Sequence, residues 1–372
     1  LSSMVVEILR LGIYQIIYMD KVPESAAVNE SVKLAKKLTR GLSGFVNAIL
    51  RSVIREQDSI GIEDLAANDI EAISFIYNIP LWLINLWISE FGRDKTEDLC
   101  TWFNEQPKLT ARINTILIDI PQCLTMLNEQ GWAVTQDSNY EDIIYINSHR
   151  GSLEKSEAFI KGYITFMDKA SMLVARLVNP QPGECILDCC AAPGGKSMYM
   201  ATLMNNVGSL MSCDIHEHKI ELMNSNADRL GASIVHTKVQ DATKLPDSWN
   251  SYFDRVLVDA PCSGLGILQK KLDMRWRKQE SILSELPSLQ LAILERAAMT
   301  VKEKGYLIYS TCTLNYKENE EVVEAFLQKH KEFSIIPVAD DFPLKSNSGM
   351  ITTYPPTDDM DGFFMVKMQR IS

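Results

Sequence analysis

The sequence has no apolar run long enough to cross a membrane. Over residues 1–20 the apolar pattern is interrupted by Glu7, Arg10 and Asp20, so it falls well short of the roughly 18 consecutive apolar residues that a span requires. The same stretch has neither a basic start nor a small-residue cleavage site, so it is not a secretory signal. We therefore expect a cytoplasmic protein without a membrane partner.

A metal or disulfide scaffold is not indicated either. The eight cysteines include no CxxC pair, which is the spacing typical of structural zinc sites. They also do not form a disulfide framework for a chain of 372 residues, because such frameworks belong to short secreted domains. Reduced thiols and no bound metal are the simplest expectation.

Positive charge is scarce as well. The chain has 37 Lys and Arg against 48 Asp and Glu, a net charge of −11, which argues against a general polyanion binder. Any contact with nucleic acid must then come from local basic patches, although a solvated helix face is the alternative for each. The candidates are Lys270, Lys271, Arg275, Arg277 and Lys278 around Trp276, and Lys33, Lys36, Lys37, Arg40 and Arg51.

Apolar periodicity predicts three regions. Residues 1–75 show apolar residues three and four apart, typical of helices, and because this pattern is under way at residue 1 we expect further helices before it. Residues 76–157 combine helices with short β-rich runs and predict a small α/β unit. Residues 158–372 alternate buried strands with helices, which predicts a doubly wound α/β sheet with residues 362–369 as a closing edge strand.

Polar residues and a Gly-rich loop follow the predicted parallel strands. Ligands of a doubly wound sheet bind beyond the carboxyl ends of its strands, and four successive strand ends carry Asp188, Asp214, Asp241 and Asp259. A loop that opens a helix offers unpaired N–H groups, and a carboxylate one strand later suits a ribose diol. We therefore predict a nucleoside-cofactor site, with a tight turn and Asx or helix caps as the structural alternatives. The loop consists of Ala191, Ala192, Pro193, Gly194, Gly195 and Lys196, which matches neither GxGxxG nor GxxxxGKS.

Two strand ends also carry cysteines. Cys262 follows Asp259 in DAPCSG, and Cys312 lies in STCT at the end of the next predicted strand. If these strands are neighbours, both thiols face one cleft. A lone strand-end cysteine is more often a small buried hydrophobe, but two of them beside a carboxylate and above a cofactor loop predict a catalytic pair.

These motifs resemble those of the Nop/Sun family of RNA cytosine-5 methyltransferases, and within it the bacterial Sun/Fmu branch that modifies small-subunit ribosomal RNA. LDCCAAPGGKS, DAPCSG and STCT carry the resemblance, supported by PKLTARIN, FMDKAS, ENEEVV and DGFF. VNESVKLAKK and GFVNAILR resemble the NusB-like helical domain of that branch. The resemblance implies a NusB-like RNA-binding domain at 1–75, a small α/β linking or RNA-binding unit at 76–157 and a Rossmann-like methyltransferase domain at 158–372.

By this resemblance the cofactor is S-adenosylmethionine. The segment from Cys190 to Lys196 would surround its methionine part, Asp214 would bind the ribose and Asp241 would lie by the adenine. Asp259 would sit between the cofactor and the target base. The implied substrate is unassembled small-subunit ribosomal RNA, and we expect the protein to act as a monomer.

The family chemistry explains a pair of thiols. Carbon 5 of cytosine is a poor nucleophile, so attack of the Cys312 thiolate on carbon 6 first converts the ring to an enamine. Asp259 could donate a hydrogen bond to ring nitrogen 3 if burial raised its pKa, and Cys262 would help release the product. A free thiol has a pKa near 8.5, and the sequence does not show what lowers it for Cys312.

Other interpretations stay open. A DNA cytosine-5 methyltransferase would use Cys262, the cysteine after proline, as its nucleophile. An idle RNA-binding or assembly factor would keep the fold without the reaction, although Cys262, Cys312 and Asp259 are all present. A small-molecule methyltransferase would leave the paired cysteines and the N-terminal regions without a purpose.

Overall fold

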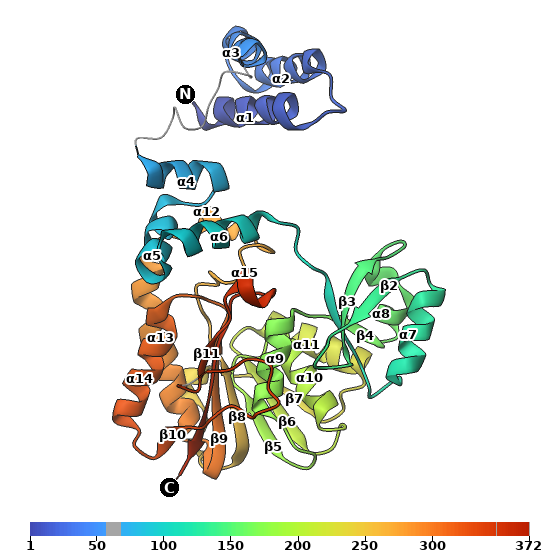
Figure 1. Cartoon of the computed structure of the whole chain (residues 1–372), viewed down its shortest axis with the longest axis vertical. Coiled ribbons are helices and arrows are strands. Elements are labelled where there is room, and N and C mark those ends of the chain that lie inside the picture. Colours follow the sequence, from blue (N-terminus) through green and yellow to red (C-terminus); the bar gives the residue numbers. More distant parts are fainter. Residues whose placement is uncertain (57–67, 347, 372) are drawn as a thin grey trace. The chain divides into compact units, whose positions relative to one another are not determined.

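The computed structural model describes residues 1–56, 68–346 and 348–371. The chain divides into two compact units, Leu1–Asn78 and Ile79–Ser372 (Figure 1). The first unit is helical and the second contains two sheets. The all-helical start and the α/β remainder predicted from periodicity are therefore confirmed.

The first unit is built on three amphipathic helices, α1 (Ser3–Tyr18), α2 (Glu24–Leu38) and α3 (Ser43–Glu56), followed by α4 (Asp69–Tyr77). Gly12 allows close packing of α1, since a Cβ there would lie 2.7 Å from Ser31 Oγ and 2.8 Å from Leu50 Cδ1. Residues 57–67 of the predicted helical region lie outside the described residues. The buried core contains Val5, Ile8, Leu9, Val28, Ala35, Val46 and Leu50.

The second unit begins with helices α5 (Leu81–Phe91) and α6 (Arg93–Asn104). Trp87 of α5 stacks on Phe103 of α6, and both are fully buried. Within the described residues, no single helix is long and apolar enough to span a membrane, and α4 and α5 satisfy length and composition only when taken together.

A small four-stranded antiparallel sheet follows, in the order β2-β3-β1-β4. Strand, helix, two strands, helix and strand in sequence make this a ferredoxin-like unit. The second helix and last strand were not expected here, and β4 carries the sheet beyond residue 157. The elements are β1 (Thr110–Ile113), α7 (Ile120–Glu129), β2 (Ala133–Gln136), β3 (Ile143–Ser148), η2 (Leu153–Lys155), α8 (Glu157–Ile160) and β4 (Ile164–Phe166).

The large sheet has the order β10-β12-β9-β8-β5-β6-β7, with β11 beside β12. The strands from β9 to β7 are parallel and carry the predicted apolar runs. The chain runs outward from β5 in both directions, so β5 and β8 form the topological switch point. The strands are β5 (Cys185–Asp188), β6 (Ser209–Asp214), β7 (Val235–Val239), β8 (Phe253–Asp259), β9 (Val301–Thr311), β10 (Phe333–Ile335), β11 (Met350–Thr352) and β12 (Phe364–Arg370).

The predicted position of the last strand is wrong. β12 does not close the edge: it lies antiparallel between β9 and β10. The outer place belongs to β10, a three-residue strand that is too short to show a period in the sequence. The doubly wound parallel core therefore carries an antiparallel edge, which is common in α/β folds.

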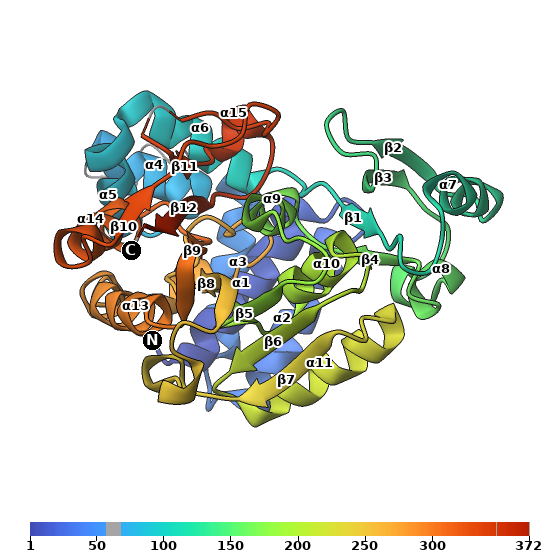
Figure 2. The ribbon, with the colours of Figure 1, turned by 90° about the horizontal axis from the view of Figure 1, so that it is seen from below.

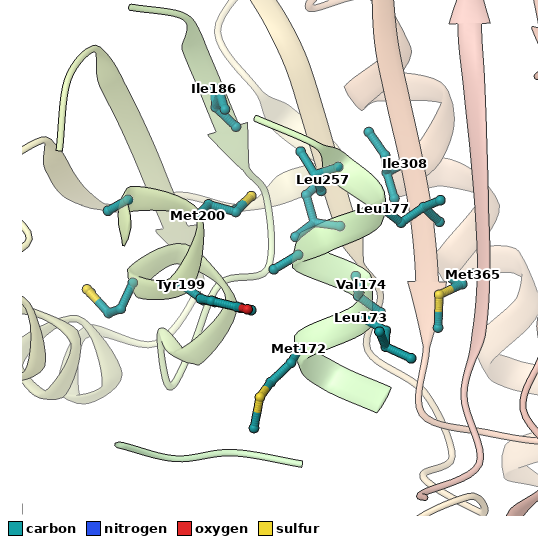
Figure 3. Close-up of a cluster of buried hydrophobic side chains, with 14 of the residues drawn as sticks. Met172, Leu173, Val174, Leu177, Ile186, Tyr199, Met200, Leu257, Ile308 and Met365 are labelled. Atoms are coloured by element: carbon teal, nitrogen blue, oxygen red, sulfur yellow. The ribbon is translucent and has the colours of Figure 1, made fainter. Parts of the chain in front are cut away.

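Helices cover both faces of this sheet (Figure 2). Alternation along β8 sends Leu257 into one buried cluster and Val256 and Val258 into the other. Figure 3 shows Leu173 and Val174 of α9 among the first cluster. The helices and 3-10 turns are α9 (Lys169–Val178), α10 (Gly195–Leu203), α11 (Glu217–Leu230), η3 (Ala242–Lys244), η4 (Asp247–Trp249), α12 (Met274–Arg277), α13 (Ile282–Ala298), η5 (Tyr316–Glu318), α14 (Glu320–Lys329) and α15 (Pro355–Asp358).

Candidate active site

A cavity of about 480 Å³ lies at the carboxyl ends of β5, β6, β8 and β9. It occupies the switch point of the sheet, where the fold predicts a ligand. Its volume is within the range of about 300–1,000 Å³ that small-molecule sites occupy. Predicted cofactor residues and both predicted catalytic cysteines line this same cavity.

The two cysteines lie side by side in the lining of the cavity. β8 and β9 are parallel neighbours with Asp259 beside Ser310, so the loops that follow them lie together. The Sγ atoms of Cys262 and Cys312 are 3.2 Å apart, and the backbone N–H of Cys312 donates to Cys262 Sγ at 3.3 Å. Both thiols are free. Within the described residues, no group of His, Cys, Asp or Glu could hold a metal ion.

The surroundings of Cys312 oppose its ionisation. The hydrogen bond with Cys262, burial and the nearby Asp259 carboxylate raise the pKa of the Cys312 thiol well above its usual range. The Lys196 ammonium acts in the opposite direction. The sequence left open what would lower this pKa. Lys196 acts in that direction, but the net effect of the surroundings is to raise the pKa of Cys312.

Asp259 accepts hydrogen bonds at both carboxyl oxygens. Ser310 Oγ donates to Oδ1 at 2.8 Å and Lys196 Nζ donates to Oδ2 at 2.7 Å. Both oxygens are thus acceptors, whereas donation to ring nitrogen 3 would require a protonated Asp259. Burial alone would lower the pKa of Lys196, but the pairing with Asp259 outweighs it and raises that pKa.

The side chain of Lys196 lies elsewhere than the sequence predicted. We expected it near the methionine part of a cofactor, yet its side chain is buried and reaches Asp259. A sequence signal existed: a lysine that opens the helix after β5 lies near the end of the neighbouring strand β8, which carries Asp259.

Three of the four strand-end aspartates line the cavity, namely Asp214, Asp241 and Asp259. Asp214 Oδ1 accepts the backbone N–H of His216 at 3.0 Å, and Lys219 Nζ lies 3.6 Å from the same oxygen. Asp241 caps η3 by accepting the backbone N–H of Thr243 at 2.9 Å. The structural alternative of a helix cap is therefore correct for Asp241, which also borders the cavity.

Asp188 is separate from the cavity lining. It is fully buried, and its Oδ2 accepts a bond from Ser197 Oγ at 2.6 Å while Oδ1 has no partner among the described residues. Burial raises the pKa of Asp188 to about 7. Its role is therefore to hold the start of α10 against β5.

The Gly-rich loop contributes Ala192 to the cavity, and Cys190, just before the loop, also lines it. Gly194 precedes α10 with φ of 99°, and a Cβ there would lie 3.2 Å from Met223 Cγ, so both backbone and packing require glycine. Gly195 is different, since its nearest contact would be at 3.7 Å. Only the first of the two glycines is thus dictated by conformation.

The cavity fits a nucleoside cofactor that carries positive charge. Carboxylates of Asp214, Asp241 and Asp259 line it, and apolar residues supply walls for a base. The first turn of α10 has N–H groups without helical partners, which suit a carboxylate group. The apolar lining includes Ile215, Ala260, Pro261, Ile267, Leu289 and Ile293.

The predicted basic patch near Trp276 is smaller than expected. The Lys270 ammonium is engaged in ion pairs with Asp168 and Asp361, and Arg275 is 3% exposed and bonds Asn104 and a backbone carbonyl of α6. Both hold the structure together and neither is available to phosphate. Lys271, Arg277, Lys278 and Trp276 remain accessible, as do Lys33, Lys36, Lys37, Arg40 and Arg51 in the helical unit.

Comparison with known proteins gives the family. The family described as "16S rRNA methyltransferase RsmB/F" matches residues 175–369. The chain belongs to this RsmB/F methyltransferase family. The NusB family matches residues 1–55, and the "Methyltr_RsmF/B-like, ferredoxin-like domain" matches residues 79–151. The predicted family and fold are confirmed, and as a methyltransferase of this family the chain has S-adenosylmethionine as its cofactor.

Relatives of this RsmB/F chain match along most of their length. "Probable ribosomal RNA small subunit methyltransferase B" of Bacillus subtilis is 37% identical over 98% of this chain and 83% of the relative. "Ribosomal RNA small subunit methyltransferase B" of Serratia proteamaculans is 30% identical over 97% and 81%. The crystal structure of PH0851 is 27% identical with a TM-score of 0.86, covering 98% of this chain and 82% of that chain. NSun6 from Pyrococcus horikoshii shares the fold at 21% identity, with a TM-score of 0.70 over 77% and 97%.

Proposed function

We propose that this RsmB/F-family chain methylates carbon 5 of a cytosine in small-subunit ribosomal RNA through a covalent Cys312–cytosine intermediate. The observation that carries the proposal is a pair of free thiols 3.2 Å apart in the cavity that also bears the Asp214, Asp241 and Asp259 carboxylates. Packing alone gives no reason for two thiols and three carboxylates around one cavity.

S-adenosylmethionine would be held by the residues around β5, β6 and β7. Asp214 would bind the ribose hydroxyls, Asp241 would lie by the adenine, and the loop from Cys190 to Lys196 would surround the methionine part beside the N-terminus of α10. When bound, the cofactor supplies an electrophilic methyl group on a sulfonium.

Cys312 would be the nucleophile. Its thiol loses a proton, and the thiolate forms a bond to carbon 6 of the base while the carbon 5–carbon 6 double bond opens to give a nucleophilic carbon 5. Cys262 Sγ, which shares a hydrogen bond with Cys312, is placed to relay that proton to solvent. Lys196 favours the resulting thiolate by its charge.

Asp259 and Lys196 would orient the base. The carboxylate is fixed by Ser310 and Lys196 on one side of the cavity, close to Cys312. An ionised Asp259 accepts hydrogen bonds, so it suits the exocyclic amino group of cytosine. Donation toward ring nitrogen 3, which Asp259 could provide only in its protonated form, would then fall to the Lys196 ammonium.

Cys262 would serve product release. After methylation, carbon 5 carries both the methyl group and its original proton. Removal of that proton restores the double bond and breaks the carbon 6–sulfur bond to Cys312. Because Cys262 Sγ is 3.2 Å from Cys312 Sγ, its thiolate, or a water that it orients, is close to that proton.

The RNA would bind through limited basic patches. A base must leave its stack to enter this cavity, so single-stranded or looped RNA is the expected form. Lys271, Arg277 and Lys278 would contact phosphates, and Trp276, 60% exposed, would offer a stacking surface. The predicted division at residues 75 and 157 assigns further RNA binding to the first two regions.

Nucleoside analysis tests this function. The protein is incubated with unmodified small-subunit ribosomal RNA and methyl-labelled cofactor, and the RNA is then digested. We expect the label in 5-methylcytidine, loss of the label with Cys312→Ala, and retained activity with the control Cys185→Ala at the opposite end of β5. Label in another nucleoside would refute the carbon-5 assignment, and labelling of mature subunits but not of free RNA would refute the unassembled substrate.

A further inference from the structure

A buried carboxylate next to the catalytic loops is not used by the chemistry above. Glu318 ends η5 and is fully buried. Its Oε1 accepts from Ser263 Oγ at 2.5 Å and Asn315 Nδ2 at 2.9 Å, and its Oε2 accepts from Ser263 N at 2.8 Å and Gln290 Nε2 at 2.9 Å. All these donors are uncharged. A carboxylate with this many buried donors is strongly tied to its surroundings.

These contacts hold the backbone on both sides of Cys262. Glu318 takes the N–H of Ser263, the residue after Cys262. Gln290 on α13, fully buried and bonded to Glu318, donates also to the carbonyl of Pro261, the residue before Cys262. Glu318 and Gln290 therefore set the position of the Cys262 loop.

Asn319, the residue after Glu318, holds the backbone on both sides of Cys312. Asn319 Oδ1 accepts from Thr311 Oγ1 at 2.5 Å, and its Nδ2 donates to the carbonyl of Thr313 at 2.9 Å, which are the two neighbours of Cys312. Ser263 Oγ and Thr313 Oγ1, 2.8 Å apart, join the two loops. Glu318 and Asn319 thus each anchor one cysteine loop, and the Ser263–Thr313 contact connects the two loops.

We propose that Glu318 is a positioning residue that holds Cys262 for product release, while the separate Asn319 contacts position Cys312 for attack. The inference rests on the proposed function and adds the residue that controls its second half-reaction. Loss of the carboxylate leaves buried donors unsatisfied and frees the Cys262 loop to shift. A displacement of about 1 Å at a reacting group can cost about 10²-fold in rate.

Glu318→Gln tests the inference, because it keeps the size and removes one acceptor oxygen. Protein, cofactor and small-subunit ribosomal RNA are mixed, and denaturant-resistant protein–RNA adduct and methylated product are measured together. We expect product formation to fall about tenfold to 10²-fold while adduct accumulates, so that the ratio of adduct to product rises at least tenfold. Cofactor affinity should stay within about twofold.

A merely structural role would give a different result. Partial unfolding lowers adduct and product in proportion, so an unchanged ratio in Glu318→Gln, with or without loss of activity, overturns the inference. Glu321→Gln on the exposed side of α14 is the matched control and should resemble wild type. If Glu318→Gln fails to fold, Gln290→Leu, which removes the bonds to Glu318 and to the carbonyl of Pro261, is measured instead, and the same ratio of adduct to product decides. Wild type without methyl transfer would instead overturn the proposed function and the inference with it.

Discussion

Cys312 is held in a form that resists ionisation in the free protein. Its bond to Cys262, its burial and the charge of Asp259 all raise the pKa of the thiol, and Lys196 offsets only part of this. The thiol is therefore protected from adventitious reaction, and proton removal belongs to the catalytic cycle. We expect the methylation rate to rise as pH rises through the neutral range.

The neighbouring thiol is the largest cause of this shift, so its removal should lower the pKa of Cys312. In Cys262→Ala, alkylation of Cys312 by iodoacetamide should reach half its maximal rate at a lower pH than in wild type. Peptide mass spectrometry separates Cys312 from the other cysteines. An unchanged or higher midpoint would show that Cys262 does not govern this thiol.

Asp188 makes the folded state sensitive to pH. Its pKa is raised by burial from 3.8 to about 7. The contribution of the neutral carboxyl to the free energy of unfolding is therefore full below about pH 4, declines as pH rises toward 7 and is lost above it. Asp188→Asn removes this dependence. In urea unfolding, the free energy of unfolding of the variant relative to that of wild type should rise between about pH 5 and about pH 7, by up to roughly 1.4 kcal/mol per pH unit. A difference that is constant with pH would contradict the burial argument.

At the same scale, the sequence identified which residues gather at the strand ends but not how each side chain turns. The order of strands brings Cys262 and Cys312 together, as the motif spacing suggested. It could not show that Asp188 turns to Ser197 while Asp214 turns to the cavity, because this depends on the path of the loop after each strand. The pairing of Lys196 with Asp259 depends on strand neighbours that are distant in sequence.

Among the elements, the turn into α10 depends on one glycine more than on the other. Gly194→Ala should destabilise the protein by about 1–3 kcal/mol, because φ of 99° is strained for alanine and its Cβ would crowd Met223. Gly195→Ala, the matched control, should change stability by less than about 1 kcal/mol. Urea unfolding measures both. Equal losses for the two variants would refute this account of the loop.

Element prediction failed for short strands. β5, β6, β8 and β9 carry apolar runs that are recognisable in sequence. β4 and β10 have three residues each, which is too few for a periodic signal, and their partners are remote in the chain. For the same reason the sequence placed β12 at the edge, although β10 takes that place.

For the whole molecule, a net charge of −11 means that RNA affinity must come from few residues. Lys271→Gln, Arg277→Gln and Lys278→Gln combined should reduce the slope of log affinity against log salt by about 2 to 3, since each phosphate contact contributes about 0.7–0.9. Lys304→Gln, an exposed residue at the end of β9 opposite to Cys312, is the control. An unchanged slope would place the RNA path elsewhere.

The sequence predicted the broad architecture of the molecule correctly, because helix and strand periods change along the chain and the motifs fall on strand ends. The helical start and the Rossmann-like sheet are confirmed by the structure and the family matches. Which of the basic residues are engaged in contacts within the protein was not predictable in the same way. Lys270 and Arg275 are taken up by Asp168, Asp361 and Asn104, contacts that exist only after folding.

The order of attack and release is the central claim, and covalent trapping measures it directly. Cys262→Ala and Cys312→Ala are each incubated with small-subunit ribosomal RNA and cofactor, then denatured and resolved. We expect Cys262→Ala to accumulate a denaturant-resistant protein–RNA adduct and Cys312→Ala to form none. An adduct with Cys312→Ala and none with Cys262→Ala would make Cys262 the nucleophile and contradict the account.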